Sequence, residues 1–124
     1  MARWSWVASG STWADTTEQT ASSVACRLHA IEIEPNASQS AAAYVQLWDA
    51  SGPTPGTTAP DYAIMIPTNT NRGLTRKIKA IFPNGGLEFA TAITLFVATA
   101  AGGGTAVATT VIPQEIKLYF TPMA

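Results

Sequence analysis

Charged residues are scarce in this chain of 124 residues, because Asp, Glu, Lys and Arg together make up only 12% of it. That is about half of the ~25% that soluble domains usually carry. The net charge is −1, so the chain lacks the basic excess that draws proteins to nucleic acid or to anionic membranes. Hydrophobic residues make up 47%, which excludes the composition of a disordered chain. The surface must therefore be covered by small polar residues and alanine, or be partly hidden in an assembly.

Cysteine and histidine are each present once, as Cys26 and His29. A lone cysteine cannot form an intrachain disulfide and fits folding in a reducing compartment. The pair cannot build the usual Cys/His zinc site. The two residues fall on opposite phases of one expected strand, so their side chains should point to opposite faces and not form a nucleophile–base pair. We expect no metal and no cofactor.

Catalytic and targeting motifs are also missing. Glu32 and Glu34 share one face of an expected strand, but an acid/base pair needs a partner across a cleft, so a solvated face is the simpler interpretation. The sequence has no phosphate loop, dinucleotide fingerprint or calcium loop. No run is as long as a transmembrane helix, and the first seven residues do not resemble a signal peptide. We expect a non-enzymatic protein with no membrane partner.

Short alternating apolar and polar runs, separated by Gly/Pro-rich segments, are what the sequence does contain. The length fits one domain, residues 1–124, with one core. The pattern predicts an all-β fold, a single antiparallel β-sandwich of Greek-key or jelly-roll type. A phase slip at Ala30–Ile31 predicts a bulge or a bend. The expected strands are residues 4–6, 24–34, 41–49, 62–66, 74–82, 87–89, 93–98, 107–112 and 116–120, and the expected loops include 15–23, 49–60 and 100–105.

The clearest local signal lies in residues 82–99, where an apolar strand end is followed by Pro83, Asn84, Gly85 and Gly86. Asn-Gly and Gly-Gly supply the positive φ angles that tight turns require, so this segment predicts a hairpin. The run that follows, residues 93–98, is apolar on both phases. It is therefore either a buried central strand or a strand that meets a partner subunit on its outer face.

Three of the four tryptophans, Trp4, Trp6 and Trp13, lie in the first thirteen residues. Trp4 and Trp6 share a phase and should lie on one face of a strand. Two interpretations stay open. They pack on the domain's own core, or this tryptophan-rich N-terminal segment (residues 1–14) docks on a neighbouring subunit, since Trp is favoured at interface centres.

The one local concentration of charge consists of Arg72, Arg76, Lys77 and Lys79. Lysines on an edge strand protect it from aggregation, and this is the simplest interpretation. An acidic partner surface is the alternative. Nucleic acid comes third, because no aromatic side chains that could stack on bases are interleaved with these charges.

Several short segments between residues 44 and 120 form a recognisable order. They are Tyr44-Val45-Gln46-Leu47-Trp48-Asp49, Gly56-Thr57, Ala59-Pro60, Ile64-Met65-Ile66-Pro67, Phe82, Gly86-Leu87-Glu88-Phe89-Ala90-Thr91 and Val97-Ala98-Thr99 before a glycine-rich loop. Taken together, these segments resemble a family of small β-sandwich proteins encoded among the virion genes of tailed bacteriophages. The resemblance covers residues 44–120 and departs from the family pattern at Trp48, where Tyr is expected, and at Ala92, where Gly is expected.

The resemblance implies a jelly-roll capsid decoration, or cement, protein of the virion, made in the host cytoplasm. Its partners would be the major capsid protein and copies of itself, as a homo-trimer, without nucleic acid. We expect Trp4, Trp6 and Trp13 to be docking anchors, with Arg76, Lys77 and Lys79 as a secondary polar contact.

Two other functions remain open. One is a tail, baseplate or adaptor component with the same fold. The other is a carbohydrate-binding β-sandwich module that uses exposed aromatic residues such as Trp48 or Tyr62.

Overall fold

The computed structural model describes residues 4–8, 19–35, 41–67, 78–105 and 115–123, and of residues 4–8 only the backbone is described. This part of the chain contains strands and no helix, so the all-β prediction is confirmed. The strands are β1 (Trp4–Ala8), β2 (Gln19–Ser22), β3 (Cys26–Glu34), β4 (Ala43–Trp48), β5 (Tyr62–Ile66), β6 (Ile78–Ile81), β7 (Leu87–Phe89), β8 (Ile93–Ala98) and β9 (Glu115–Pro122).

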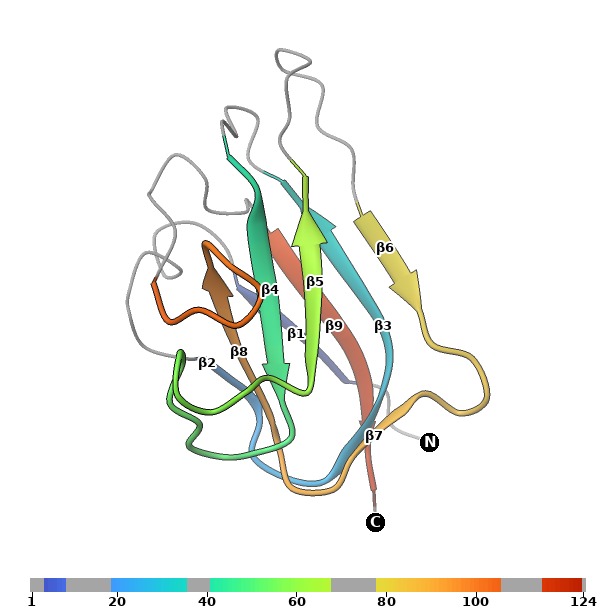
Figure 1. Cartoon of the computed structure of the whole chain (residues 1–124). Coiled ribbons are helices and arrows are strands. Elements are labelled where there is room, and N and C mark those ends of the chain that lie inside the picture. The colour runs from blue at the N-terminus through green and yellow to red at the C-terminus, as the bar shows by residue number, and fades with distance from the viewer. Residues whose placement is uncertain (1–3, 9–18, 36–40, 68–77, 106–114, 124) are drawn as a thin grey trace.

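The strands form two antiparallel sheets that lie in two layers (Figure 1). Sheet A has the order β1-β9-β3-β6, with β7 also paired to β3, and sheet B has the order β2-β8-β4-β5. The pairing is nested along the chain. The strand β1 pairs with β9, β2 with β8, β3 with both β6 and β7, and β4 with β5. The chain is thus arranged as one long hairpin, with its tip between β4 and β5, that is rolled into two layers.

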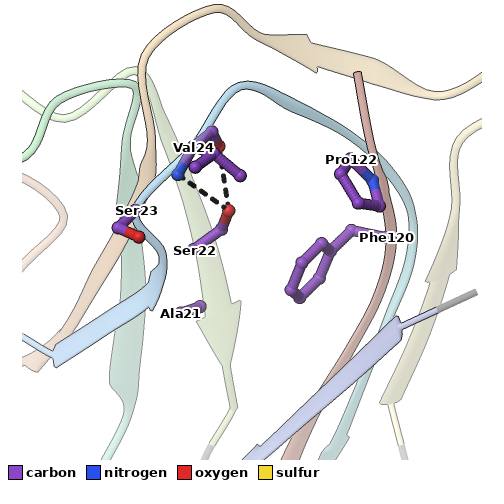
Figure 2. Close-up of a pocket in the computed structure, with 6 residues that line it drawn as sticks. All are labelled: Ala21, Ser22, Ser23, Val24, Phe120 and Pro122. Atoms are coloured by element: carbon purple, nitrogen blue, oxygen red, sulfur yellow. Dashed lines mark hydrogen bonds between the residues drawn. The ribbon is translucent and has the colours of Figure 1, made fainter. Parts of the chain in front are cut away.

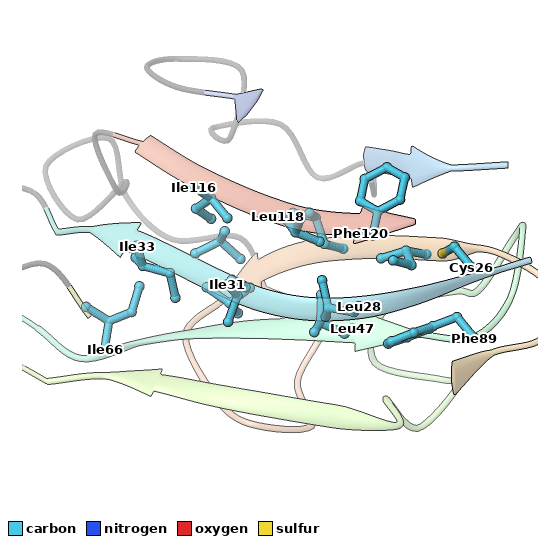
Figure 3. Close-up of a cluster of buried hydrophobic side chains, with 14 of the residues drawn as sticks. Cys26, Leu28, Ile31, Ile33, Leu47, Ile66, Phe89, Ile116, Leu118 and Phe120 are labelled. Carbon is cyan, nitrogen blue, oxygen red and sulfur yellow. The ribbon is translucent and has the colours of Figure 1, made fainter. Parts of the chain in front are cut away.

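One apolar core joins the two sheets (Figure 3). Sheet A contributes alternate residues of β3 and β9, among them Ile31 and Leu118, and sheet B contributes alternate residues such as Leu47 and Leu95. The period of two puts these side chains on the inner face of each sheet. The fully buried members of the core are Cys26, Leu28, Ile31, Ile33, Ala43, Val45, Leu47, Ile66, Phe89, Ile93, Leu95, Ile116 and Leu118.

The predicted bulge is present in β3. The register between β3 and β9 shifts between Leu28 and Ala30, so His29 is the extra residue. Before the bulge Cys26 and Leu28 are buried, and after it Ile31 and Ile33 are buried. The bulge therefore restores the apolar phase to the core after the slip in the sequence.

The predicted hairpin at residues 82–86 is wrong. Its turn chemistry is correct, since Asn84, Gly85 and Gly86 all have positive φ angles of 62°, 88° and 90°. However, β6 and β7 do not pair with each other. Both pair with β3, β6 beyond the bulge and β7 before it, and the amide of Phe82 donates to the carbonyl of His29. The glycines thus form an excursion within one interrupted strand opposite the bulge.

One expected loop is wrong in part, and two expected strands lie wholly or partly outside the described residues. Residues 15–23 were expected to form a loop, but residues 19–22 form the edge strand β2 against β8. Its sequence QTAS lacks apolar alternation because an edge strand need bury little, and so no pattern marks it. The expected strand at residues 107–112 and the first part of the one at 74–82 lie outside the described residues.

The run at residues 93–98 is a buried central strand, the first of the two alternatives. All six residues of β8 are buried, between β2 on one side and β4 on the other. Its inner phase joins the main core, whereas Phe96 and Ala98 form a second cluster with Trp48 on the outer face of sheet B. The chain's own loops, described below, cover that second cluster.

Candidate interaction surfaces

The outer face of sheet A carries the charge. Every charged residue that lies on a strand of the described chain is found there, because each alternates with core residues of the same strand. Arg27 and Glu88 form a cross-strand ion pair at 3.5 Å, and Lys117 lies 3.5 Å from Glu115. Ion pairs this exposed contribute little to stability. The charged residues of this face are Arg27, Glu32, Glu34, Lys79, Glu88, Glu115 and Lys117.

Lys117 illustrates the electrostatics of this face. Its pKa is raised, chiefly by the nearby carboxylate of Glu115 and further by Tyr119 and Glu32. The register also places Glu32 opposite both Lys117 on β9 and Lys79 on β6. Opposite charges therefore alternate across the strands, and the face has no large excess of one sign.

The outer face of sheet B carries no charged residue on any of its strands, and all the side chains of those strands are described. Its outward phase consists of Tyr44, Gln46 and Trp48 on β4, with Ala63 and Met65 on β5 and Thr94, Phe96 and Ala98 on β8. The two outer faces therefore differ sharply in polarity. Only part of the outer face of sheet B is exposed, with Ala63 and Met65 on β5, and burying that part against a partner would desolvate no charged side chain of the sheet.

Trp48 is one of the two aromatic residues expected to be exposed for carbohydrate binding, and that expectation is wrong. Its side chain is only 1% exposed, and its indole N–H donates to the carbonyl of Thr58 at 3.0 Å. The Pro/Gly-rich segment between β4 and β5 thus folds back over the end of β4. Of the two residues, Tyr62 remains partly exposed and packs on Phe89 with a ring separation of 5.8 Å.

Gln46 holds the glycine-rich segment after β8 against sheet B. Its fully buried side-chain amide donates to the carbonyls of Ala100, Ala101 and Gly103, at 3.2, 2.9 and 2.9 Å. This segment also packs on the β4–β5 connection, since a Cβ atom at Gly104 would lie 2.5 Å from the carbonyl oxygen of Pro55. The two connections therefore form one cover over Trp48 and Phe96.

Asp49 fixes the connection between β7 and β8. Its carboxylate accepts hydrogen bonds from the amides of Ala90, Thr91 and Ala92 at 3.0, 2.8 and 3.3 Å. Partial burial would raise the pKa of Asp49, but the three amides outweigh it and the net pKa is lowered. The amide of Asp49 itself donates to Asp61 at 2.7 Å. The arrangement serves to position backbone segments.

A shallow hollow of about 210 Å³ lies between the end of β2 and the end of β9 (Figure 2). Phe120, Pro122, Ala21 and Val24 line it together with Ser22 and Ser23. The Ser22 hydroxyl donates to the carbonyl of Val24 and accepts from its amide, as Figure 2 shows, so its polar atom is occupied within the turn. The volume is below the ~300 Å³ at which small-molecule sites begin.

Cys26 and His29 do not meet, as the strand phases predicted. Cys26 belongs to the core, where burial raises the pKa of its thiol despite a hydrogen bond with Ser22, and where the charge of Asp49 raises it further. His29 lies at the bulge and shares a hydrogen bond with the hydroxyl of Thr121. Buried thiols with raised pKa values are unreactive.

Four large apolar side chains are exposed in the part of the chain that the structure describes, and the sequence did not mark them as surface residues. They are large residues on strand edges or turns, and each reads as an ordinary strand residue in the sequence. Two of them, Tyr62 and Met65, lie on β5, with exposed fractions of 40% and 52%. The other two are Val24, at 55%, and Ile81, at 67%.

The structure separates the predicted docking residues that it describes. Trp4 and Trp6 lie on β1 at one edge of sheet A, paired in register with the buried residues Phe120 and Leu118. Lys79 lies exposed on β6 at the opposite edge, with β9 and β3 between. Trp13, Arg76 and Lys77 lie outside the described residues. The tryptophan segment and Lys79 therefore do not form one patch.

The described residues were considered for a metal site and for a membrane-spanning helix, and they provide neither. No three His, Cys, Asp or Glu side chains among them come close enough together to hold a metal ion. None of them belongs to a helix with the length and hydropathy that a membrane crossing needs.

Comparison with known proteins adds no relative. No family model, no curated protein and no solved structure matches the chain.

Proposed function

We propose that the chain is a structural protein of a tailed-phage virion, a jelly-roll decoration protein that cements the head shell. The observation that carries the proposal is the nested strand pairing, β1 with β9, β2 with β8, β3 with β6 and β7, and β4 with β5. Counting β6 and β7 as one interrupted strand, this nesting is what we expect of an eight-stranded jelly roll, an architecture of viral capsid domains as well as of lectin domains and cupins. It supports the resemblance carried by residues 44–120.

The proposed mechanism is physical. Each copy buries surface against the major capsid protein and against other copies, as a trimer at local three-fold positions. Interfaces of ordinary size, repeated over many copies, then hold the shell together. The part of the outer face of sheet B that the chain's own connections leave exposed, with Ala63 and Met65 on β5, supports this role because it can be buried without desolvating charged groups. The protein would be made in the host cytoplasm and act in the virion.

The proposed anchors remain Trp4, Trp6 and Trp13, with Arg76, Lys77 and Lys79 as a polar contact. The test is to add the purified chain to shells assembled without it and to measure the bound fraction by sedimentation. We expect wild-type chain to pellet with the shells and to raise their melting temperature. A chain that stays in the supernatant at all concentrations would overturn the proposed function.

The anchor role is tested with Trp4→Ala/Trp6→Ala and, separately, with Trp13→Ala. We expect each variant to keep its β-sheet circular dichroism and to lose most shell binding. Val24→Ala is the matched control, because Val24 is an exposed apolar residue in the turn between β2 and β3. If the tryptophan variants bind the shells as the control does, these residues are not anchors, even if the chain itself is a shell protein.

A further inference from the structure

The turn at residues 83–86 lies in the connection between β6 and β7, which loops out to the side of the molecule (Figure 1). Its two central residues, Asn84 and Gly85, have φ angles of 62° and 88°, so it is a turn of type I′. A single hydrogen bond closes it, from the amide of Gly86 to the carbonyl of Pro83, and at 3.3 Å this bond is long. The turn is therefore held only weakly from within.

Asn84 and Gly85 are also open to solvent. Both residues are exposed, and a Cβ atom at Gly85 would meet nothing within 4 Å. Among the contacts of the described chain, no hydrogen bond involves the side-chain amide of Asn84 or the backbone amide of Gly85. Because glycine has no Cβ, nothing at Gly85 hinders the approach of its nitrogen to the preceding side chain. The two neighbouring groups are thus free to meet.

We propose that Asn84 is a site of spontaneous covalent modification, at which the amide nitrogen of Gly85 attacks the Cγ atom of the Asn84 side chain. The new N–Cγ bond closes a succinimide ring, the Cγ–Nδ2 bond breaks, and ammonia leaves with the proton given up by the Gly85 amide. A water molecule then hydrolyses the ring. Cleavage at the Cγ–N bond gives aspartate. Cleavage at the other carbonyl gives isoaspartate, in which the backbone runs through the former side chain.

The isoaspartate product weakens the pairing of β7 with β3. It lengthens the backbone by one carbon at a turn whose two ends are both fixed on β3. At one end the amide of Phe82 donates to the carbonyl of His29 at 2.9 Å. At the other end a Cβ atom at Gly86 would lie 2.6 Å from the carbonyl oxygen of Leu28, so the backbone already touches β3. Neither end can take up the extra atom, so the type I′ turn is lost.

The test is to incubate the full chain at mildly alkaline pH in water enriched in heavy oxygen and to map the modified peptides by mass spectrometry. We expect Asn84 to lose ammonia and gain a solvent oxygen at a rate within about tenfold of the rate in the urea-unfolded chain, because an exposed turn with few contacts opens at little cost. The other asparagines precede residues with side chains and should react more slowly. They are Asn36, Asn69 and Asn71.

A folded chain that keeps Asn84 intact while the unfolded chain loses it would overturn the proposal. The matched control is Asn84→Gly, because glycine accepts the positive φ and has no side-chain amide to react. We expect its 83–86 peptide to keep its mass. None of these outcomes bears on shell binding, since the reaction does not depend on the proposed function.

The effect on β7 is tested by comparing the separated isoaspartate form with freshly purified Asn84→Asp in urea unfolding. Both carry the added charge, but only the first has the longer backbone, and aspartate tolerates positive φ as asparagine does. We expect Asn84→Asp to unfold at the wild-type urea concentration and the isoaspartate form to unfold at a lower one. Equal midpoints for the two would overturn the weakened pairing of β7 with β3.

Discussion

At the scale of single residues, Asp49 is the clearest case of a polar group that organises backbone. It lies next to β4 in the chain, yet its carboxylate accepts from the amides of Ala90, Thr91 and Ala92. A sequence pattern marks Asp49 as the end of a strand, but its partners are more than forty positions away. Such a contact follows from the stacking of the two sheet ends and could not be predicted from spacing.

Asp49→Asn is expected to lower the free energy of unfolding by about 1–3 kcal/mol, because hydrogen bonds to a charged group contribute about that much. The measurement is chemical denaturation at pH 7. Asp61→Asn is the matched control, since Asp61 accepts only from the amide of Asp49 among the described contacts and an Asn oxygen can still do so. Equal losses in the two variants would contradict the role assigned to Asp49.

The lowered pKa of Asp49 gives a pH dependence with a definite sign. The unfolded carboxylate binds its proton at higher pH than the folded one does, so the stabilisation is fully present above the unfolded pKa. It is lost as the pH falls through the folded pKa. We expect wild-type stability to fall more steeply than that of Asp49→Asn below about pH 4. Parallel acid profiles of the two proteins would contradict this.

At the scale of elements, the connection between β6 and β7 shows that turn residues predict a local conformation but not which strands pair. The turn at residues 84–86 was predicted correctly, but the strand with which β7 pairs was not: it is β3 and not β6. Turn chemistry fixes the local φ angles, whereas the strand that receives β7 is chosen by the core. Phe89 must be buried, and pairing with β3 beside Cys26 achieves this. A hairpin would instead place β7 on the side of β6 that faces away from β3, and β7 would lose its pairing with Cys26, Arg27 and Leu28.

Gly86 and Gly85 provide a matched pair that tests this geometry. Both have positive φ, so an alanine at either site carries a left-handed strain of about 1–2 kcal/mol. A Cβ at Gly86 would also lie 2.6 Å from the carbonyl oxygen of Leu28, whereas one at Gly85 meets nothing within 4 Å. We expect Gly86→Ala to destabilise by about 1–3 kcal/mol more than Gly85→Ala. Equal values in denaturant unfolding would mean that the excursion does not pack on β3.

At the scale of the whole molecule, alternation along β3, β4, β5 and β9 was enough to predict an all-β fold, because inward residues must repeat every second position. It was not enough to find β2, whose polar residues bury little, or to separate the two outer faces. The outer phase of β4 reads as a surface in the sequence. These outward residues form a second buried cluster only because the β4–β5 connection and the segment after β8 fold over Trp48 and Phe96.

The candidate interaction surfaces also depend on the arrangement of the whole molecule. The charged and uncharged faces arise from the phase of every strand at once, so no single motif could reveal them. The docking role of Trp4, Trp6 and Trp13 stays a prediction. The register of β1 puts Trp4 and Trp6 opposite core residues of β9, at the far edge of sheet A from Lys79. Docking through both the tryptophans and Lys79 would require a partner that reaches two edges of one sheet.

The most direct measurement is the copy number of this chain in purified virions of its source, by quantitative mass spectrometry against the major capsid protein. The account predicts a number comparable to that of the capsid protein, as a decoration protein of the shell requires. A dozen or so copies would place the chain in the tail. Its absence from the particles would contradict a structural role in the virion altogether.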